Sequence, residues 1–150
     1  MRALGINLAA VFALALALGG AATAATQSGA RTTNLSTART GLGRVIVNGS
    51  GRTLYLFEKD KRGHSACSGI CATYWPPLLA NGKTVATGVQ RSLLGTIRRA
   101  NGTKQVTIAG HPVYLFSGDS KRGQTNGEGL TDFGASWYAL SPSGKKIDRD

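Results

Sequence analysis

Short apolar runs separated by glycine, asparagine and serine begin at residue 43 and continue almost to the end of the chain. Two examples are the β-branched run at residues 45–47 and the aromatic-containing run at residues 54–57. Runs of this length, bounded by turn residues, are typical of antiparallel strands. Helical spacing is found at residues 91–97, where Gly95 limits the helix to about one turn. The pattern predicts an all-β fold of about seven or eight strands, a small antiparallel sandwich or barrel-like domain with little helix.

The strand pattern occurs twice along the chain. Residues 51–60 read GRTLYLFEKD and residues 110–119 read GHPVYLFSGD, and each segment follows a β-branched run and precedes Lys-Arg-Gly. Further along, Trp75 corresponds to Trp137. Because these features recur in the same order, we expect two similar β units packed around one core. The units span about 43–86 and 94–148, within a single domain at 43–150.

Residues 1–24 have the composition of a secretory signal peptide. An apolar run at residues 8–18 follows a positively charged start, and small residues at Ala22 and Ala24 form a cleavage site. Residues 25–42 are rich in Ser, Thr and Ala without apolar periodicity, which predicts a flexible linker. No cysteine lies near the cleavage site to carry a lipid. We therefore expect a secreted or extracytoplasmic protein, periplasmic or extracellular, without a lipid anchor or a transmembrane span after cleavage.

Positive charge is in large excess, with 18 Lys and Arg against 7 Asp and Glu and a formal net charge of +11. The simplest interpretation of such an excess is a solvated surface that aids solubility, and the functional alternative is electrostatic binding of anions. The expected partners are an anionic envelope polymer, lipid headgroups or another exported protein. Nucleic acid is not expected for an exported protein, and no cofactor motif is present. The basic residues proposed for this surface are Lys61, Arg62, Arg98, Arg99, Lys121 and Arg122.

Cys67 and Cys71 are the two cysteines of the chain. In an oxidising compartment a close pair is expected to form a disulfide, which would stabilise a local loop. The alternative is a redox or metal-handling site that uses both thiols and His64. Redox pairs are more commonly spaced Cys-x-x-Cys, and zinc requires further ligands. Both interpretations remain open from the sequence, and the identity of any metal is undetermined.

The aromatic residues of the repeated strands alternate with aliphatic ones. Tyr55 and Phe57 share one face of a strand, as do Tyr114 and Phe116, while the other face of each strand is aliphatic. Since both faces are apolar, we expect these strands to be central and their rings to be buried in the core. An exposed ring platform for ligand stacking is the alternative.

Asp60 and Asp119 follow the two strands, each three residues after the phenylalanine. A carboxylate at the end of a strand accepts backbone N–H groups of the following turn, which is the structural interpretation. A metal site or a general acid–base pair built from both repeats is the alternative, and it requires the two carboxylates to share a cleft. The chain contains no nucleophile elbow, phosphate loop or zinc-protease motif, so no catalytic residue is assigned.

The two Tyr-x-Phe-x-x-Asp segments resemble the bacterial secreted-repeat or predicted lipoprotein family, which has a Y-x-[FWY]-x-x-D motif. The stretch from Cys67 to Leu78 and Gln105-Val-Thr also look like that family. The resemblance implies export, a duplicated fold and bacterial origin, and it implies no reaction. This chain departs from the lipoprotein members because it lacks the acylated cysteine.

The leading hypothesis is therefore an exported, non-enzymatic β domain that binds an envelope component or has a structural role there. The alternative is the redox or metal-handling protein that uses Cys67 and Cys71. A hydrolase built on Asp60 and Asp119 is the third hypothesis.

Overall fold

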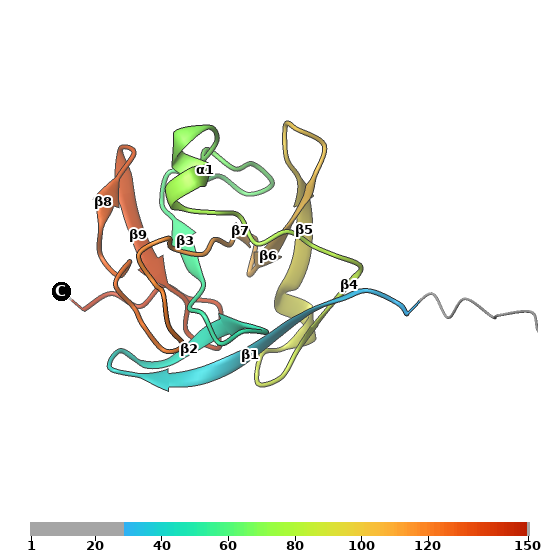
Figure 1. Ribbon diagram of the computed structural model, residues 1–150, viewed down its shortest axis with the longest axis horizontal. Coiled ribbons are helices and arrows are strands. Elements are labelled where there is room, and N and C mark those ends of the chain that lie inside the picture. The colour runs from blue at the N-terminus through green and yellow to red at the C-terminus, as the bar shows by residue number, and fades with distance from the viewer. Residues whose placement is uncertain (1–28, 150) are drawn as a thin grey trace, which may run out of the picture.

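A computed structural model describes residues 29–149 (Figure 1). The signal peptide predicted at residues 1–24 lies outside the described residues. Within the described part, nine strands form three sheets of three strands each. The all-β prediction is confirmed, and the strands form three small open sheets in place of a closed barrel.

The three sheets have the orders β2-β1-β4, β3-β9-β8 and β5-β6-β7. Pairing is antiparallel except between β1 and β4, which run parallel. The strands are β1 (Thr32–Thr40), β2 (Gly43–Asn48), β3 (Tyr55–Phe57), β4 (Lys83–Ala86), β5 (Leu94–Arg98), β6 (Lys104–Ile108), β7 (His111–Pro112), β8 (Thr131–Asp132) and β9 (Ala135–Ala139).

The flexible linker predicted at residues 25–42 is wrong for most of its length, because Thr32–Thr40 form β1. Polar residues that prefer strands, threonine above all, make up this segment. At the start of the strand, exposed and buried positions alternate, and the buried ones are Thr33 and Leu35, which are 8% and 3% exposed. The strand is also fixed on both sides, by β2 and by β4. The domain therefore begins before residue 43.

Helix is scarce in the described part of the chain. The predicted helical turn at residues 91–97 is a 3-10 turn at Arg91–Leu93 that leads directly into β5. The α-helix α1 (Ile70–Tyr74) was not predicted, because five residues are too few to show helical periodicity. No helix among residues 29–149 has the length and apolarity required to cross a bilayer.

The two repeats contain corresponding elements, and the aromatic strand of each repeat pairs with the other repeat. The hairpin β1–β2 in the first repeat corresponds to β5–β6 in the second. Tyr55 of β3 pairs with Ala139 of the second repeat, and Tyr114 pairs with Pro77 of the first. Each aromatic strand is thus flanked by the segment that follows the tryptophan of the other repeat.

The core consists of an aromatic cluster and an aliphatic cluster on the two faces of the repeated strands. Tyr55 and Phe57 belong to the aromatic cluster, whereas Leu54 and Leu56 belong to the aliphatic one. All four side chains are at most 4% exposed. The predicted burial of both faces is confirmed for the first repeat. In the second repeat Val113 and Tyr114 are buried but Leu115 and Phe116 are half-buried, and isolated bridges at Tyr114 take the place of a continuous strand.

The position of β1 leads to a first prediction. Leu35→Ala should lower the free energy of unfolding by about 2–5 kcal/mol, because a buried leucine is replaced by a cavity. Asn34→Ala, at the exposed neighbouring position, should change it by less than about 0.5 kcal/mol. Urea unfolding of both variants would measure the difference. Equal, negligible effects would mean that this segment is a linker after all.

Candidate functional site

The two motif tyrosines meet at the centre of the molecule. Tyr55 N–H donates to Tyr114 O at 2.9 Å, and Tyr114 N–H donates to Tyr55 O at 2.9 Å. This reciprocal pair relates the two repeats by an approximate two-fold axis. Both tyrosines are fully buried. The motif residues of both repeats are therefore gathered around this axis.

Each tyrosine hydroxyl donates to the aspartate of the other repeat. Tyr55 donates to Oδ2 of Asp119 at 2.6 Å, and Tyr114 donates to Oδ2 of Asp60 at 2.7 Å. The other carboxylate oxygens accept backbone N–H groups, at 2.6 Å from Ala66 and at 2.9 Å from the second-repeat residue Asn126. The aspartates thus cap the turns that follow their strands, as expected, and also join the two repeats.

Burial controls the protonation of this cluster. It raises the pKa of Tyr55 and of Tyr114 well above their ordinary values, and the neighbouring carboxylates raise both further. The hydroxyls therefore remain protonated and act as donors. Burial also raises the pKa of Asp60, while the N–H of Ala66, the Tyr114 hydroxyl and the positive charge of Arg99 oppose that rise.

The aromatic residues of the two repeats are interleaved in one stack. Trp75 and Trp137 lie parallel, with ring centroids 3.9 Å apart and an interplanar angle of 6°. Phe57 stacks on Trp137 at 4.0 Å, and Phe116 stacks on Trp75 at 4.3 Å. Each phenylalanine thus covers the tryptophan of the other repeat. Since both tryptophans are fully buried, these rings form the core and offer no exposed platform to a ligand.

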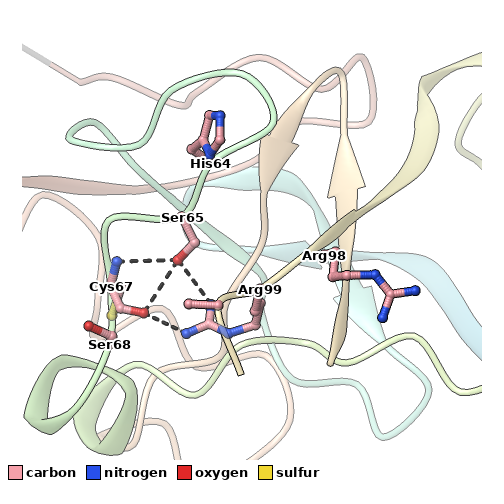
Figure 2. A pocket seen from close by; sticks show the side chains of 7 residues that line it. His64, Ser65, Cys67, Ser68, Arg98 and Arg99 are labelled. Atoms are coloured by element: carbon pink, nitrogen blue, oxygen red, sulfur yellow. Dashed lines mark hydrogen bonds between the residues drawn. The ribbon is translucent and has the colours of Figure 1, made fainter. Parts of the chain in front are cut away.

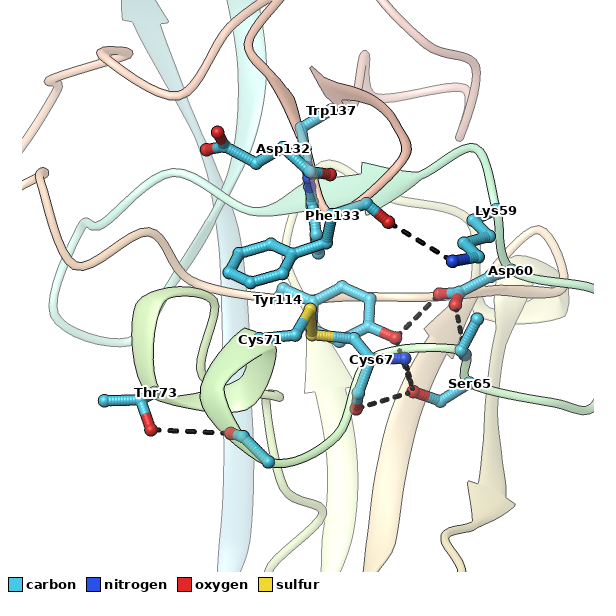
Figure 3. Close-up of a disulfide and its surroundings, with 12 residues drawn as sticks. Lys59, Asp60, Ser65, Cys67, Cys71, Thr73, Tyr114, Asp132, Phe133 and Trp137 are labelled. Atoms are coloured by element: carbon cyan, nitrogen blue, oxygen red, sulfur yellow. Dashed lines mark hydrogen bonds between the residues drawn. A yellow bond between two sulfur atoms is a disulfide. The ribbon is translucent and has the colours of Figure 1, made fainter.

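Cys67 and Cys71 form the predicted disulfide, which closes the loop before α1. Figure 3 shows the bond between α1 and the ring of Tyr114, with Asp60 and Ser65 at the tyrosine hydroxyl. The two cysteines are 0% and 5% exposed and pack in the aromatic cluster. Thiol–disulfide exchange requires access to a sulfur atom, so this bond has the surroundings of a structural one.

A pocket of about 400 Å³ opens between the disulfide loop and the end of β5 (Figure 2). Two arginines are the charged residues of its wall: Arg98 is exposed and points outward, whereas Arg99 is half-buried and points into the loop. Polar side chains complete the wall together with Cys67 and Ala100. They are His64, Ser65 and Ser68.

Neutral acceptors hold the guanidinium of Arg99 in place. Nη1 donates to Ser65 Oγ at 2.9 Å and to Gln105 Oε1 at 2.7 Å, and Nη2 donates to the carbonyl oxygen of Cys67 at 2.6 Å. A guanidinium has five N–H donors, so these bonds use only part of its capacity. The side chain is therefore preorganised by the loop.

A chain of hydrogen bonds connects the pocket to the half-buried carboxylate of Asp60. The hydroxyl of Tyr114 has a single proton, and it points toward Asp60 in a hydrogen bond. The hydroxyl of Ser65 therefore donates to the Tyr114 oxygen, at a distance of 2.7 Å. Arg99 in turn donates to Ser65. The positive charge of Arg99 thus lies at one end of the network and Asp60 at the other. Asp60 offsets part of that charge, and Arg98 adds a second positive charge at the pocket.

The other predicted basic residues lie on two corresponding turns. Lys61, Arg62, Lys121 and Arg122 are all exposed. A Cβ added to Gly51 would meet the Arg122 guanidinium, and one added to Gly110 would meet Arg62. Each basic turn therefore packs against the start of the other repeat's aromatic strand. The structure does not bring these turns into the pocket wall.

Several carboxylates are directed into the protein and do not neutralise its surface. Besides Asp60 and Asp119, Glu128 accepts the N–H of Ala139 at 2.6 Å, and burial raises its pKa. Asp119 is 2% exposed. Within residues 29–149, ion pairs at Lys146 engage Glu58 and Asp148. Internal use of the carboxylates thus leaves the surface strongly basic.

Ser65 and Ser68 were not predicted as site residues. Their only sequence signal is their position on either side of Cys67. Of the residues named from the sequence, Cys67, Arg98 and Arg99 meet at the pocket, together with His64. Among residues 29–149 no group of three or more His, Cys, Asp and Glu side chains is placed to hold a metal ion.

The chain belongs to the family described as a secreted repeat of unknown function, whose sequence profile matches residues 36–79 and 95–141, more than half of the chain. The first matched segment begins within β1, in agreement with the place of that strand in the fold. Comparisons with curated proteins and with solved structures gave no match. The family places this protein among secreted proteins and supplies no activity.

Unequal burial of the two aspartates leads to a second prediction. Tyr55→Phe should lower the free energy of unfolding by about 1–3 kcal/mol, because Asp119 loses a donor that water cannot easily replace. Tyr114→Phe should cost less, because Asp60 is half-buried and accessible to water. Tyr138→Phe is the matched control, with an expected change below about 0.5 kcal/mol. Denaturant unfolding would rank the three variants, and the reverse order would contradict the argument.

The buried disulfide leads to a third prediction. Thiol titration should find no free thiol when a mild reductant is added to the native protein, and two per chain when denaturant is also present. The double substitution Cys67→Ser and Cys71→Ser should lower the free energy of unfolding by about 2 kcal/mol, since the closed loop is short. Rapid reduction of the native protein would instead support the redox hypothesis.

Proposed function

We propose that this protein is an exported, non-catalytic β domain of the bacterial cell envelope that binds phosphate-bearing anionic polymers through the pocket at Arg98 and Arg99. It is released after signal cleavage and carries no lipid anchor. The secreted character of the family supports export. The excess of positive charge supports an anionic partner.

The observation that carries the proposal is the preorganised guanidinium of Arg99. Three neutral acceptors orient it at the wall of a pocket of about 400 Å³, and no hydrogen-bonded carboxylate among the described residues competes for it. Arginine suits phosphate oxygens because its planar fork donates in parallel. Exposed Arg98 supplies a second cation, and Ser68 supplies a hydroxyl donor.

The motif carboxylates support a non-catalytic function. Each oxygen of Asp60 and Asp119 that faces the network already accepts a hydroxyl or a backbone N–H. A general acid or base must reach the proton of a substrate, and Asp119 is 2% exposed. These contacts suit a structural task better than a reaction.

The redox alternative receives less support. It would require the Cys67–Cys71 bond to be attacked by a thiolate, yet both sulfurs belong to the aromatic cluster. The titration of thiols described above tests the redox alternative.

The binding proposal predicts that inorganic polyphosphate binds at the pocket. Titration followed by NMR should shift the backbone amides of residues 64–68 and 98–100, and affinity should fall as salt is added because the attraction is electrostatic. Arg98→Gln should weaken binding by about tenfold, since one charge-assisted contact to a phosphate oxygen is lost.

Arg39→Gln is the matched control, because it removes the same charge from an exposed position on β1. Binding by this variant should differ from the wild type by less than about twofold, as expected for a distant screened charge. Equal losses in both variants would show attraction to net charge alone. The pocket would then have no specific part in binding.

A further inference from the structure

Three large apolar side chains project from the same end of the molecule. Ile70 is 71% exposed, Tyr74 is 54% exposed and Phe133 is 40% exposed. Tyr74 and Phe133 are in contact, with ring centroids 6.2 Å apart. We name Ile70, Tyr74 and Phe133 the apolar crest. Soluble surfaces carry single exposed apolar residues, but a cluster on two neighbouring elements is typical of an interaction site.

The backbone at Phe133 is unusual for such a residue. Phe133 and Gly134 form the two-residue turn between β8 and β9, with φ of 58° and 92°. A turn with both φ values positive favours Asn or Asp at its first position, because a bulky side chain is disfavoured there. The turn geometry therefore does not favour phenylalanine here, and 40% of the residue remains exposed although its ring contacts Tyr74. A side chain held at the tip against local preference points to a use outside the fold.

Positive charge lies on both sides of the apolar crest. Lys59 donates from Nζ to the carbonyl oxygen of Phe133 at 3.3 Å. On the other side of α1 lies the basic pocket, whose residue Ser68 precedes Ile70 by two positions. In Figure 1 the β8–β9 turn, α1 and the β5–β6 turn together form the upper edge of the molecule. Asp132, next to Phe133, places an acidic side chain at this edge.

We propose that this edge docks on an anionic lipid bilayer. Ile70, Tyr74 and Phe133 enter the boundary between headgroups and acyl chains, while the pocket and Lys59 contact lipid phosphates. The proposal rests on the phosphate-binding function of the pocket and names its source as a membrane surface. Interfacial binding combines buried apolar area with attraction to anionic headgroups, and tyrosine is well suited to that boundary.

Lipid fits this edge better than a protein partner because of how charge and apolar surface are arranged. A bilayer offers a negatively charged layer above an apolar interior, which matches cations flanking projecting apolar side chains. In this orientation the cations contact the headgroups while the apolar side chains reach the acyl chains.

Phe133→Asn tests the apolar contribution without weakening the fold. Asparagine tolerates the positive φ at this position, which offsets the loss of the ring contact with Tyr74, so the thermal midpoint should stay close to that of the wild type. Co-sedimentation with vesicles of phosphatidylglycerol and phosphatidylcholine should show affinity at least about tenfold lower. Binding of soluble polyphosphate should remain unchanged, because the pocket is intact.

Leu79→Ser is the matched control, since Leu79 is 45% exposed but lies outside the apolar crest. This variant should bind the vesicles as the wild type does. Asp132→Asn should increase vesicle affinity, because it removes the acidic group at the edge. Vesicles of phosphatidylcholine alone should bind weakly.

The possible results separate the two proposals. If Phe133→Asn binds vesicles as well as the wild type while Arg98→Gln does not, the apolar crest is not a membrane site and the pocket remains an anion site. If the wild type binds polyphosphate but no vesicles, the lipid surface is the wrong occupant and a soluble polymer is favoured. If the wild type binds neither polyphosphate nor vesicles, the proposed function itself fails.

Discussion

The hydrogen bonds between Tyr55 and Asp119 and between Tyr114 and Asp60 determine how the two halves of this protein fit together. A carboxylate is expensive to bury, and each one here is compensated by a hydroxyl and a backbone N–H. The backbone N–H comes from the same repeat but the hydroxyl comes from the other one, so neither half alone can fully satisfy its own carboxylate. The stacked rings follow the same rule, since Phe57 covers Trp137 and Phe116 covers Trp75. The repeats are thus two complementary halves of a single core.

Differences between the repeats are concentrated around the two tyrosine hydroxyls. The disulfide and α1 occur in the first repeat, where Ser65 approaches the hydroxyl of Tyr114. At the corresponding place in the second repeat, the N–H of Gly127 donates to the hydroxyl of Tyr55 at 3.3 Å. The Ser65 side chain in the first repeat and the Gly127 backbone in the second thus both hydrogen-bond to a motif tyrosine hydroxyl. Only the side-chain version continues outward to Arg99 and the pocket, so the proposed binding site belongs to the asymmetric part of a nearly symmetric fold.

The sequence predicted the fold class, the two repeats, the buried aromatic strands and the disulfide, because each depends on local spacing or on apolar pattern. It did not predict which partners the motif residues choose. Asp60 follows Tyr55 by five residues, yet the hydroxyl of Tyr55 reaches Asp119, 64 residues away. Local spacing cannot distinguish a contact within a repeat from one between repeats. The strand at Thr32–Thr40 was missed because its inward positions include threonine as well as leucine. The pocket was predicted in part, since Arg98 and Arg99 are adjacent in sequence but their serine neighbours are brought to them by folding.

The exchange of partners has a consequence for the order of events during biosynthesis. A ribosome releases the first repeat before the second, and at that stage Trp75 lacks Phe116 and Asp60 lacks Tyr114. Until the second repeat is synthesised, the first repeat therefore exposes apolar rings and unpaired strand edges. Such intermediates are prone to aggregation and proteolysis. Contacts between residues far apart in sequence also slow folding, because a long loop must close before they form. A chain of this design gains from being kept unfolded until its last strand has been made.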